Sequence, residues 1–124
     1  MAMTPERRVK TQVRKVLDKL GAYYVMPVTG GYGNSGAPDF LVCLHGRFVG
    51  IECKAGANTP TPLQEKNLRM IERSGGVSLV VNEDTVEVLE TELHRSVTCF
   101  CVLTHAVSSA LFKESRHAAL HHPP

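Results

Sequence analysis

The stretch Gly36-Ala-Pro-Asp-Phe-Leu-Val-Cys-Leu-His-Gly-Arg-Phe-Val-Gly-Ile-Glu-Cys-Lys54 decides the fold that we predict for this chain. Two short apolar runs flank His45-Gly46. This pair suits a two-residue turn, because glycine adopts positive φ freely and histidine tolerates it better than most residues. Pairing outward from the turn ends by placing Asp39 opposite Glu52. The stretch therefore predicts a β-hairpin that brings two acidic residues together.

Asp39 and Glu52 indicate a metal site at the open end of this hairpin. Directly opposed residues have Cβ atoms roughly 4.5–5.5 Å apart, so the two carboxylates would repel each other. A divalent cation between them removes that repulsion. Strand alternation places Lys54 on the same face as Glu52 and turns Ile51 and Cys53 to the other face. We therefore predict a metal site with a lysine beside it.

Length and composition favour a single soluble domain. The chain has 124 residues, enough for one hydrophobic core but not for two. Its longest mainly apolar stretch, residues 97–112, is shorter and more polar than the roughly 20 residues of a membrane span. The first residues lack the apolar core of a signal peptide. We expect a cytoplasmic protein without membrane contact, in the host cytosol if a phage encodes it.

The cysteines and the net charge exclude two further classes of protein, namely disulfide-stabilised domains and strongly basic nucleic-acid carriers. The four cysteines fit reduced thiols, since nothing resembles a disulfide framework. A net charge of +2 excludes a strongly basic nucleic-acid carrier and permits a locally positive face. Zinc binding by cysteines and histidines is an alternative, but the spacing of these residues matches no structural zinc pattern. Those residues are Cys99, Cys101, His94, His105, His117, His121 and His122.

The N-terminal segment predicts an amphipathic helix. Thr4-Pro5-Glu6 opens it, with threonine as the N-cap, proline in the first turn and an acid that the helix dipole favours. Apolar residues at helical spacing follow until Gly21 ends the helix. Its basic residues form either a solvated face or a surface that contacts phosphates, and the sequence leaves both open. They are Arg7, Arg8, Lys10, Arg14, Lys15 and Lys19.

A strand and a glycine-rich loop precede the hairpin. Residues 23–28 have strand composition, and Pro27 points to an edge or irregular position. The loop from Thr29 to Gly36 contains four glycines. It is either a flexible turn or a segment whose backbone approaches a phosphate. Since it matches neither glycine pattern of nucleotide-binding loops, we predict no nucleotide cofactor.

The residues after the hairpin complete an α/β pattern. Thr61-Pro62-Leu63-Gln64 starts a second helix, whose apolar side we assign to Leu63, Leu68 and Ile71. Residues 77–81 predict a strand of the buried kind, and Glu83 to Arg95 a third helix. The order α-β-β-β-α-β-α indicates a small mixed sheet flanked by helices. Further on, residues 98–103 suit a strand and residues 106–120 a helix.

With these elements placed, Pro38-Asp39 followed by Glu52-Cys53-Lys54 resembles the motif of PD-(D/E)XK nucleases. The surroundings narrow the resemblance: Glu6 opens the first helix, residues 30–36 are rich in glycine, and Thr61-Pro62-Leu63-Gln64 follows the hairpin. Together these features resemble the VRR-NUC family, the virus-type replication-repair nucleases, and especially its small stand-alone members from phages and bacteria. The resemblance covers roughly residues 6–92.

The resemblance implies a restriction-endonuclease-like core and a role for each motif residue. Asp39 and Glu52 would bind Mg²⁺, or Mn²⁺ in its place, together with the backbone carbonyl of Cys53. Lys54 would lie beside the attacking water. Gln64 would contact a metal-bound water or a phosphate.

Each of these residues also has an ordinary alternative. Asp39 after a proline can cap a turn, and Glu52 with Lys54 can form a surface ion pair. Gln64 stands at the third helical position, where a capping box places a glutamine. The resemblance implies that Glu6 approaches the metal from the first helix, but an acid in the first turn also serves the helix dipole. For Gln64 and Glu6 the sequence leaves both alternatives open.

The predicted function is a Mg²⁺-dependent endonuclease that acts on DNA, and the resemblance to the small family members implies branched DNA such as Holliday junctions as the substrate, with a role in DNA repair. Two symmetric cuts by a chain with one site imply a homodimer. We assign residues 1–96 to the nuclease domain and residues 97–124 to a C-terminal extension, which with the third helix is a candidate interface. The alternatives are a non-catalytic nucleic-acid-binding module, or a nuclease for plain duplex DNA or RNA, because phosphate contacts carry no information about branching.

Overall fold

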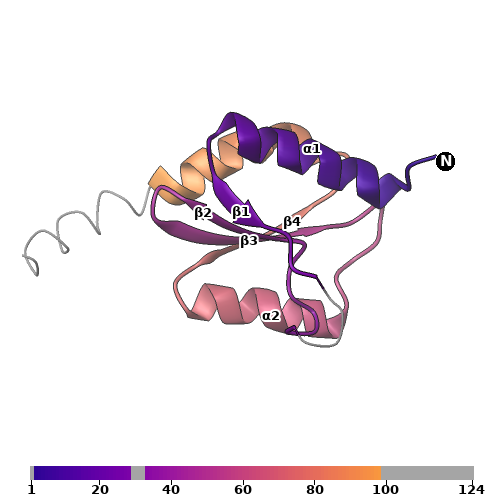
Figure 1. Ribbon diagram of the computed structural model, residues 1–124. Helices are drawn as coiled ribbons and strands as arrows, with labels where there is room; N and C mark the ends of the chain where they lie inside the picture. Colours follow the sequence, from indigo (N-terminus) through magenta and orange to yellow (C-terminus); the bar gives the residue numbers. More distant parts are fainter. Residues whose placement is uncertain (1, 29–32, 99–124) are drawn as a thin grey trace, which may run out of the picture.

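The computed structural model describes residues 2–28 and 33–98 (Figure 1). Helix α1 (Pro5–Lys19) precedes the strands β1 (Tyr23–Val25), β2 (Phe40–Leu44) and β3 (Arg47–Cys53). Helix α2 (Pro62–Arg73), strand β4 (Val77–Val81), a 3₁₀ turn η1 (Val86–Val88) and a helix over residues 89–98 follow. None of the described helices is long and apolar enough to cross a lipid bilayer.

The four strands form one mixed sheet in the order β1-β2-β3-β4. The first three strands pair antiparallel, and β4 pairs parallel to β3. Helix α1 and the helix over residues 89–98 cover one face of the sheet, and α2 covers the other (Figure 1). The predicted mixed sheet with flanking helices is therefore confirmed. Strand β1 lies at an edge, as Pro27 indicated, and ends at Val25 rather than at residue 28.

The hairpin turn has the predicted geometry. His45 and Gly46 have φ values of 50° and 75°, the positive values of a two-residue turn that matches the twist of its strands. The register pairs Leu44 with Arg47 directly beside the turn. The turn therefore fixes which residues of β2 and β3 share a face of the sheet.

The strand ladder ends at the pair Phe40 and Ile51, so the prediction that Asp39 and Glu52 pair as strand residues is wrong. In an antiparallel ladder, the bond that closes the next pair would run from the Cys53 N–H to the carbonyl oxygen of Pro38. The backbone N–H of Cys53 instead donates a hydrogen bond to Asp39 Oδ2 at 2.9 Å. Asp39 therefore lies beside the end of β3 without belonging to a strand.

The apolar side of α1 forms the core with one face of the sheet. Thr4 caps this helix by accepting a hydrogen bond from the N–H of Arg7. The buried residues of α1 are Val9, Val13 and Leu17. Alternate residues of β2 and β3 complete this layer, namely Phe40, Val42, Leu44, Val49, Ile51 and Cys53. Ile51 and Cys53 thus point to this face, as strand alternation predicted.

Helix α2 lies close to the other face of β3 because a glycine faces it. A Cβ added to Gly50 would lie 2.5 Å from Ile71 Cδ1 and 3.1 Å from Pro38 Cγ, so the Ile71 side chain would have to shift. The absence of a side chain at Gly50 lets the helix settle onto the sheet.

Two predictions of burial are wrong. Val80 is 46% exposed, so β4 is not a strand of the buried kind, because it lies at an edge of the described sheet. Leu63 is also 46% exposed. It lies against the loop residue Gly36, where an added Cβ would be 2.7 Å from Leu63 Cγ, and not over the sheet.

The third helix begins and ends later than predicted. The side chain of Asn82 accepts hydrogen bonds from the N–H groups of Asp84 and Thr85, which holds residues 83–85 in a turn before η1. Thr98 is helical and does not open a strand. Val97 is 2% exposed and belongs to the core, although we placed it in the C-terminal extension. The other predictions for residues 99–124 lie outside the described residues.

Candidate active site

Glu52 is the buried acid of the site. It is 2% exposed, although it carries a carboxylate. Its Oε1 accepts a hydrogen bond from Gln64 Nε2 at 2.7 Å and forms an ion pair with Lys54 Nζ at 3.2 Å. Its Oε2 is buried as well and has no hydrogen-bond partner among the described residues. Burying an oxygen without a hydrogen-bond partner lowers the free energy of unfolding by about 1–3 kcal/mol, and by more when the group is charged. The unpartnered Oε2 therefore indicates a place for a ligand.

Asp39 is held from two sides and is less buried. Its Oδ2 accepts the backbone N–H of Cys53, and its Oδ1 forms an ion pair with Lys10 Nζ at 2.8 Å. The same ammonium contacts Glu6 Oε1 at 3.0 Å. Glu6, Lys10 and Asp39 therefore form a chain of ion pairs that runs from α1 to the end of β3.

The two acids influence each other electrostatically. Burial raises the pKa of the Glu52 carboxyl above its ordinary value of 4.5, and the negative charge of Asp39 raises it further. Lys54 and Lys10 lower this pKa without cancelling the increase. The repulsion that the sequence predicted therefore acts on Glu52, even though the two acids do not pair as strand residues. A cation beside Oε2 would offset the free-energy cost of the buried charge and the repulsion between Glu52 and Asp39.

Cys53 contributes its backbone to the site, while its side chain lies in the core. The sulfur is fully buried, and burial followed by the charge of Asp39 raises the pKa of the thiol to about 12. The thiol therefore stays protonated at neutral pH. Because the N–H and C=O groups of a strand residue point to the same side, the Cys53 carbonyl lies on the side of Asp39. A carbonyl ligand from Cys53 is compatible with this direction.

Gln64 forms the predicted capping box and also contacts Glu52, while its predicted contact with a metal-bound water or a phosphate stays a prediction. Its Oε1 accepts the backbone N–H of Thr61 at 2.9 Å, while its own N–H donates to Thr61 Oγ1 at 3.3 Å, which makes a capping box. Its Nε2 donates to Glu52. One amide group thus caps α2 with its oxygen and holds the acid with its nitrogen.

Lys10 is the site residue that sequence reasoning missed, because we grouped it with the basic residues of the first helix. The other basic residues of α1 are exposed, and Lys10 is only partly so. One signal was available. Lys10 lies four residues after Glu6, the spacing that places two side chains next to each other on a helix.

A hollow of about 560 Å³ adjoins the chain of ion pairs. It lies between the N-terminal turn of α1 and the segment after β3. Glu6, Arg7 and Lys10 line it from one side, and Ala55 and Asn58 line it from the other. Two basic side chains, Arg7 and Lys10, and the acid Glu6 therefore border an open space beside the ion pair of Lys10 with Asp39.

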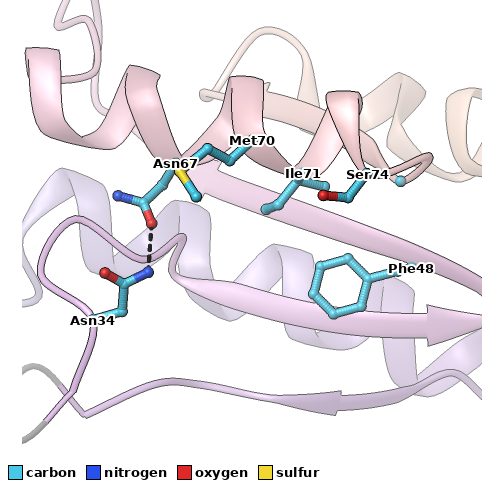
Figure 2. A pocket seen from close by; sticks show the side chains of 7 residues that line it. Asn34, Phe48, Asn67, Met70, Ile71 and Ser74 are labelled. Carbon is cyan, nitrogen blue, oxygen red and sulfur yellow. Dashed lines mark hydrogen bonds between the residues drawn. The ribbon is translucent and has the colours of Figure 1, made fainter.

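A second hollow, of about 310 Å³, lies between α2 and β3 and contains none of the predicted site residues. Figure 2 shows Asn34 and Asn67 facing each other at this hollow, where Asn34 Nδ2 donates to Asn67 Oδ1 at 2.8 Å. Asn67 Nδ2 in turn donates to the carbonyl oxygen of Ser35. These bonds tie the segment before Asp39 to the helix that carries Gln64.

The available donors fit Mg²⁺ better than zinc. Mg²⁺ usually takes one or two carboxylates and fills its other positions with waters and substrate oxygens. Asp39 and the unpartnered Oε2 of Glu52 supply such a pair. Within residues 2–28 and 33–98, no group of three or more His, Cys, Asp or Glu side chains could hold a metal ion. Of the residues considered for zinc, only His94 lies in these ranges.

Comparison with solved structures identifies the fold. A structure described as "VRR_NUC domain" matches with a TM-score of 0.61 and 28% sequence identity, over 71% of this chain and 97% of that chain. Another, described as "VRR_NUC domain protein", matches with a TM-score of 0.58 and 16% identity, over 78% of this chain and 91% of that chain. Comparisons with family models and with curated proteins gave no match. The described residues form a nuclease-fold domain with a restriction-endonuclease-like core, and in this fold the chain is similar to the two VRR_NUC domain structures.

Proposed function

We propose that this chain is a Mg²⁺-dependent endonuclease that hydrolyses DNA phosphodiester bonds. The observation that carries this proposal is the buried Oε2 of Glu52, which has no hydrogen-bond partner among the described residues. The negative charge of Asp39 also raises the pKa of this carboxyl. Folding around such an atom is unfavourable unless a cation or a donor binds there. A domain that only binds nucleic acid has no need of it.

The chain's own residues fix the geometry before a substrate binds. Gln64 and Lys54 hold Glu52, while the Cys53 N–H holds Asp39. When bound, Mg²⁺ supplies a water of lowered pKa and polarises the phosphate. The Lys54 side chain is only 12% exposed. Its ammonium would orient the attacking water or stabilise the charge that develops on the phosphate, and both effects are stronger in a partly buried place than in water.

The hollow beside α1 supports DNA as the substrate. The N-terminus of a helix favours anions, and Arg7 adds positive charge at this one, whereas Lys10 is already paired with Asp39 and Glu6. A strand of DNA lying in the hollow would place a phosphate next to Asp39. Some basic residues of α1 would then contact phosphates, while others would only face solvent.

We further propose that the substrate is branched DNA and that the chain acts as a homodimer, since a resolvase makes two cuts related by symmetry. Within the described sheet, β4 is an edge strand. Val80 on β4 and Val88 on η1 are 46% and 53% exposed, and both line an apolar hollow. An exposed apolar sheet edge favours pairing with a second copy of the chain.

Cleavage of synthetic substrates tests the activity. Wild type and Asp39→Asn are incubated with a four-way junction, a flap, duplex DNA, single-stranded DNA and duplex RNA, in Mg²⁺, Mn²⁺ or EDTA. We expect wild type to cut the junction with either metal and Asp39→Asn to cut nothing. Glu90→Gln is the matched control, because Glu90 pairs with Lys19 away from the site. Junction binding by wild type without cleavage in either metal would favour the non-catalytic module instead.

The mass of the native protein tests the homodimer. We expect a dimer for wild type and a monomer for Val80→Lys, which puts a charge on the exposed edge. Removal of residues 99–124 tests the C-terminal extension separately and leaves Val97 in the core. A monomeric wild type would contradict the homodimer without affecting the assignment of the metal site.

A further inference from the structure

Lys10 is a partly buried helix lysine that pairs with two acids. Its side chain is 27% exposed, and its ammonium contacts Asp39 Oδ1 and Glu6 Oε1 at 2.8 and 3.0 Å. Partial burial lowers the pKa of Lys10, but hydrogen bonds to Asp39 and Glu6 outweigh this effect and raise it above its ordinary value. A fixed positive charge therefore lies against an acid that we propose as a metal ligand.

The four carboxylate oxygens of the site differ in what they already bind. Asp39 Oδ2 is bound to the rigid backbone N–H of Cys53. Glu52 Oε1 is bound to both Gln64 and Lys54. Glu52 Oε2 has no partner among the described residues. A cation that binds one oxygen of each acid therefore has no competitor at Oε2 of Glu52. At Oδ1 of Asp39, it competes with the ammonium of Lys10.

We propose that Lys10 is the internal counter-ion of the metal site, which neutralises Asp39 in the metal-free protein and moves onto Glu6 when a metal binds. This inference rests on the proposed function, because it requires a divalent cation at Asp39 and Glu52. Lys10 is then a positioning residue. It holds Asp39 in place before the metal arrives, and it sets the metal affinity by competing for Oδ1.

The neighbouring residues suit such an exchange. A lysine carries a compact charge on a flexible stem, so its ammonium can change partner while the helix stays in place. Glu6 lies one helical turn away and already shares the ammonium. Losing Asp39 therefore does not leave the charge of Lys10 without a partner. Glu6 thereby obtains a role that needs no contact with the metal.

Metal affinity is the first test. Mg²⁺ and Mn²⁺ are titrated calorimetrically into DNA-free wild type, Lys10→Met and Lys19→Met. Methionine keeps most of the apolar stem of lysine and removes the charge. We expect Lys10→Met to bind both ions about tenfold more tightly, because no ammonium competes for or repels the divalent cation. Lys19→Met removes a charge from the same helix, far from Asp39, and should bind as wild type does.

Thermal unfolding without metal is the second test. In EDTA, the melting temperature of Lys10→Met should fall by roughly 4–8 °C, because the negative charges of Glu6, Asp39 and Glu52 are no longer balanced. Saturating Mg²⁺ should restore most of that loss. A lysine that is only structural would instead lower the melting temperature equally with and without metal.

A double-mutant cycle separates the two possible roles of Glu6. In the wild-type background, Glu6→Gln should weaken metal binding, because Lys10 loses its alternative partner and stays on Asp39. In the Lys10→Met background, the same change should have no effect. A loss of affinity in both backgrounds would make Glu6 a metal ligand and would overturn the exchange.

The outcomes separate this inference from the proposed function. Metal binding by wild type with unchanged or weaker binding by Lys10→Met overturns the counter-ion role and leaves the metal site intact. Binding by Lys10→Met alone supports the inference in its strongest form, with Lys10 occluding the site. No binding by either protein removes the metal site and the inference together. If Lys10→Met does not fold, Lys10→Gln is measured in the same way.

Discussion

Glu52 and Asp39 lie at the same end of neighbouring strands, yet the fold holds them in different ways. Glu52 is 2% exposed, and two side chains, one of them from α2, bind its carboxylate. The Asp39 side chain is 20% exposed and is bound by one backbone N–H and by a lysine from α1. Glu52 is thus part of the packed interior, whereas Asp39 is held at the edge of that interior by an ion pair and a hydrogen bond. Two acids that share one proposed function can therefore differ in what they contribute to folding.

The largest expected effect is on catalysis, and it should not distinguish the two acids. Asp39→Asn and Glu52→Gln each weaken one of two carboxylate ligands, so each should lower the single-turnover rate of DNA cleavage about a thousandfold, or about 4 kcal/mol. If one of these variants kept a tenth of the wild-type rate, its acid would not be a metal ligand.

Stability should reveal the difference between them. Glu52→Ala leaves the Lys54 ammonium, which is only 12% exposed, without its acid and should lower the free energy of unfolding by about 3 kcal/mol. Asp39→Ala removes the acceptor of the Cys53 N–H, but Lys10 keeps Glu6, so we expect a loss of about 1.5 kcal/mol. Urea unfolding at neutral pH in EDTA measures both. A larger loss for Asp39→Ala would contradict the comparison.

The pH dependence of stability should single out Glu52. Because burial and the charge of Asp39 raise its pKa above 4.5, the folded protein binds more protons than the unfolded chain above that pH. The stabilisation that comes from protonation of Glu52 is fully present below pH 4.5 and is lost as the pH rises through the raised pKa. Urea unfolding in EDTA over this range should show a decline that Glu52→Gln abolishes. Asp39→Asn should reduce the decline, since it removes one cause of the raised pKa.

The smallest expected effects separate the two roles of Gln64. Thr61→Ala removes the hydroxyl that caps α2 and should lower the free energy of unfolding by about 1 kcal/mol, with little change in cleavage. Gln64→Glu keeps an oxygen for the Thr61 N–H but places a second carboxylate against Glu52. It should lower the cleavage rate about tenfold, because it disturbs the pair of ligands. A similar loss of activity in both variants would mean that the cap alone positions Glu52.

The sequence was sufficient to predict the part of the site that local geometry determines. The positive φ at His45 and Gly46 sets the register, and alternation then puts Glu52 and Lys54 on one face and Cys53 on the other. The capping box was readable from four consecutive residues. Each of these features depends on neighbours along the chain or directly across a hairpin, which is why a pattern predicts them.

The features that were missed depend on contacts between distant segments. Lys10 meets Asp39 only because α1 packs on one face of the sheet with Lys10 near the end of β3, and no spacing encodes that contact. The exposure of Val80 follows from the position of β4 at the edge, and a run of apolar residues does not distinguish an edge strand from a central one. Sequence periodicity also could not show that one amide would serve both the cap and Glu52.

Gly50 gives the site a sensitivity that its chemistry does not reveal. The missing side chain at this position lets Ile71 approach the sheet, and the same helix carries Gln64 over Glu52. A single methyl group there would force the Ile71 side chain to turn aside and would crowd the ring of Pro38, which directly precedes Asp39. A substitution at a residue that touches neither substrate nor metal should therefore disturb the surroundings of both acids, and a cleavage assay of Gly50→Ala measures this effect.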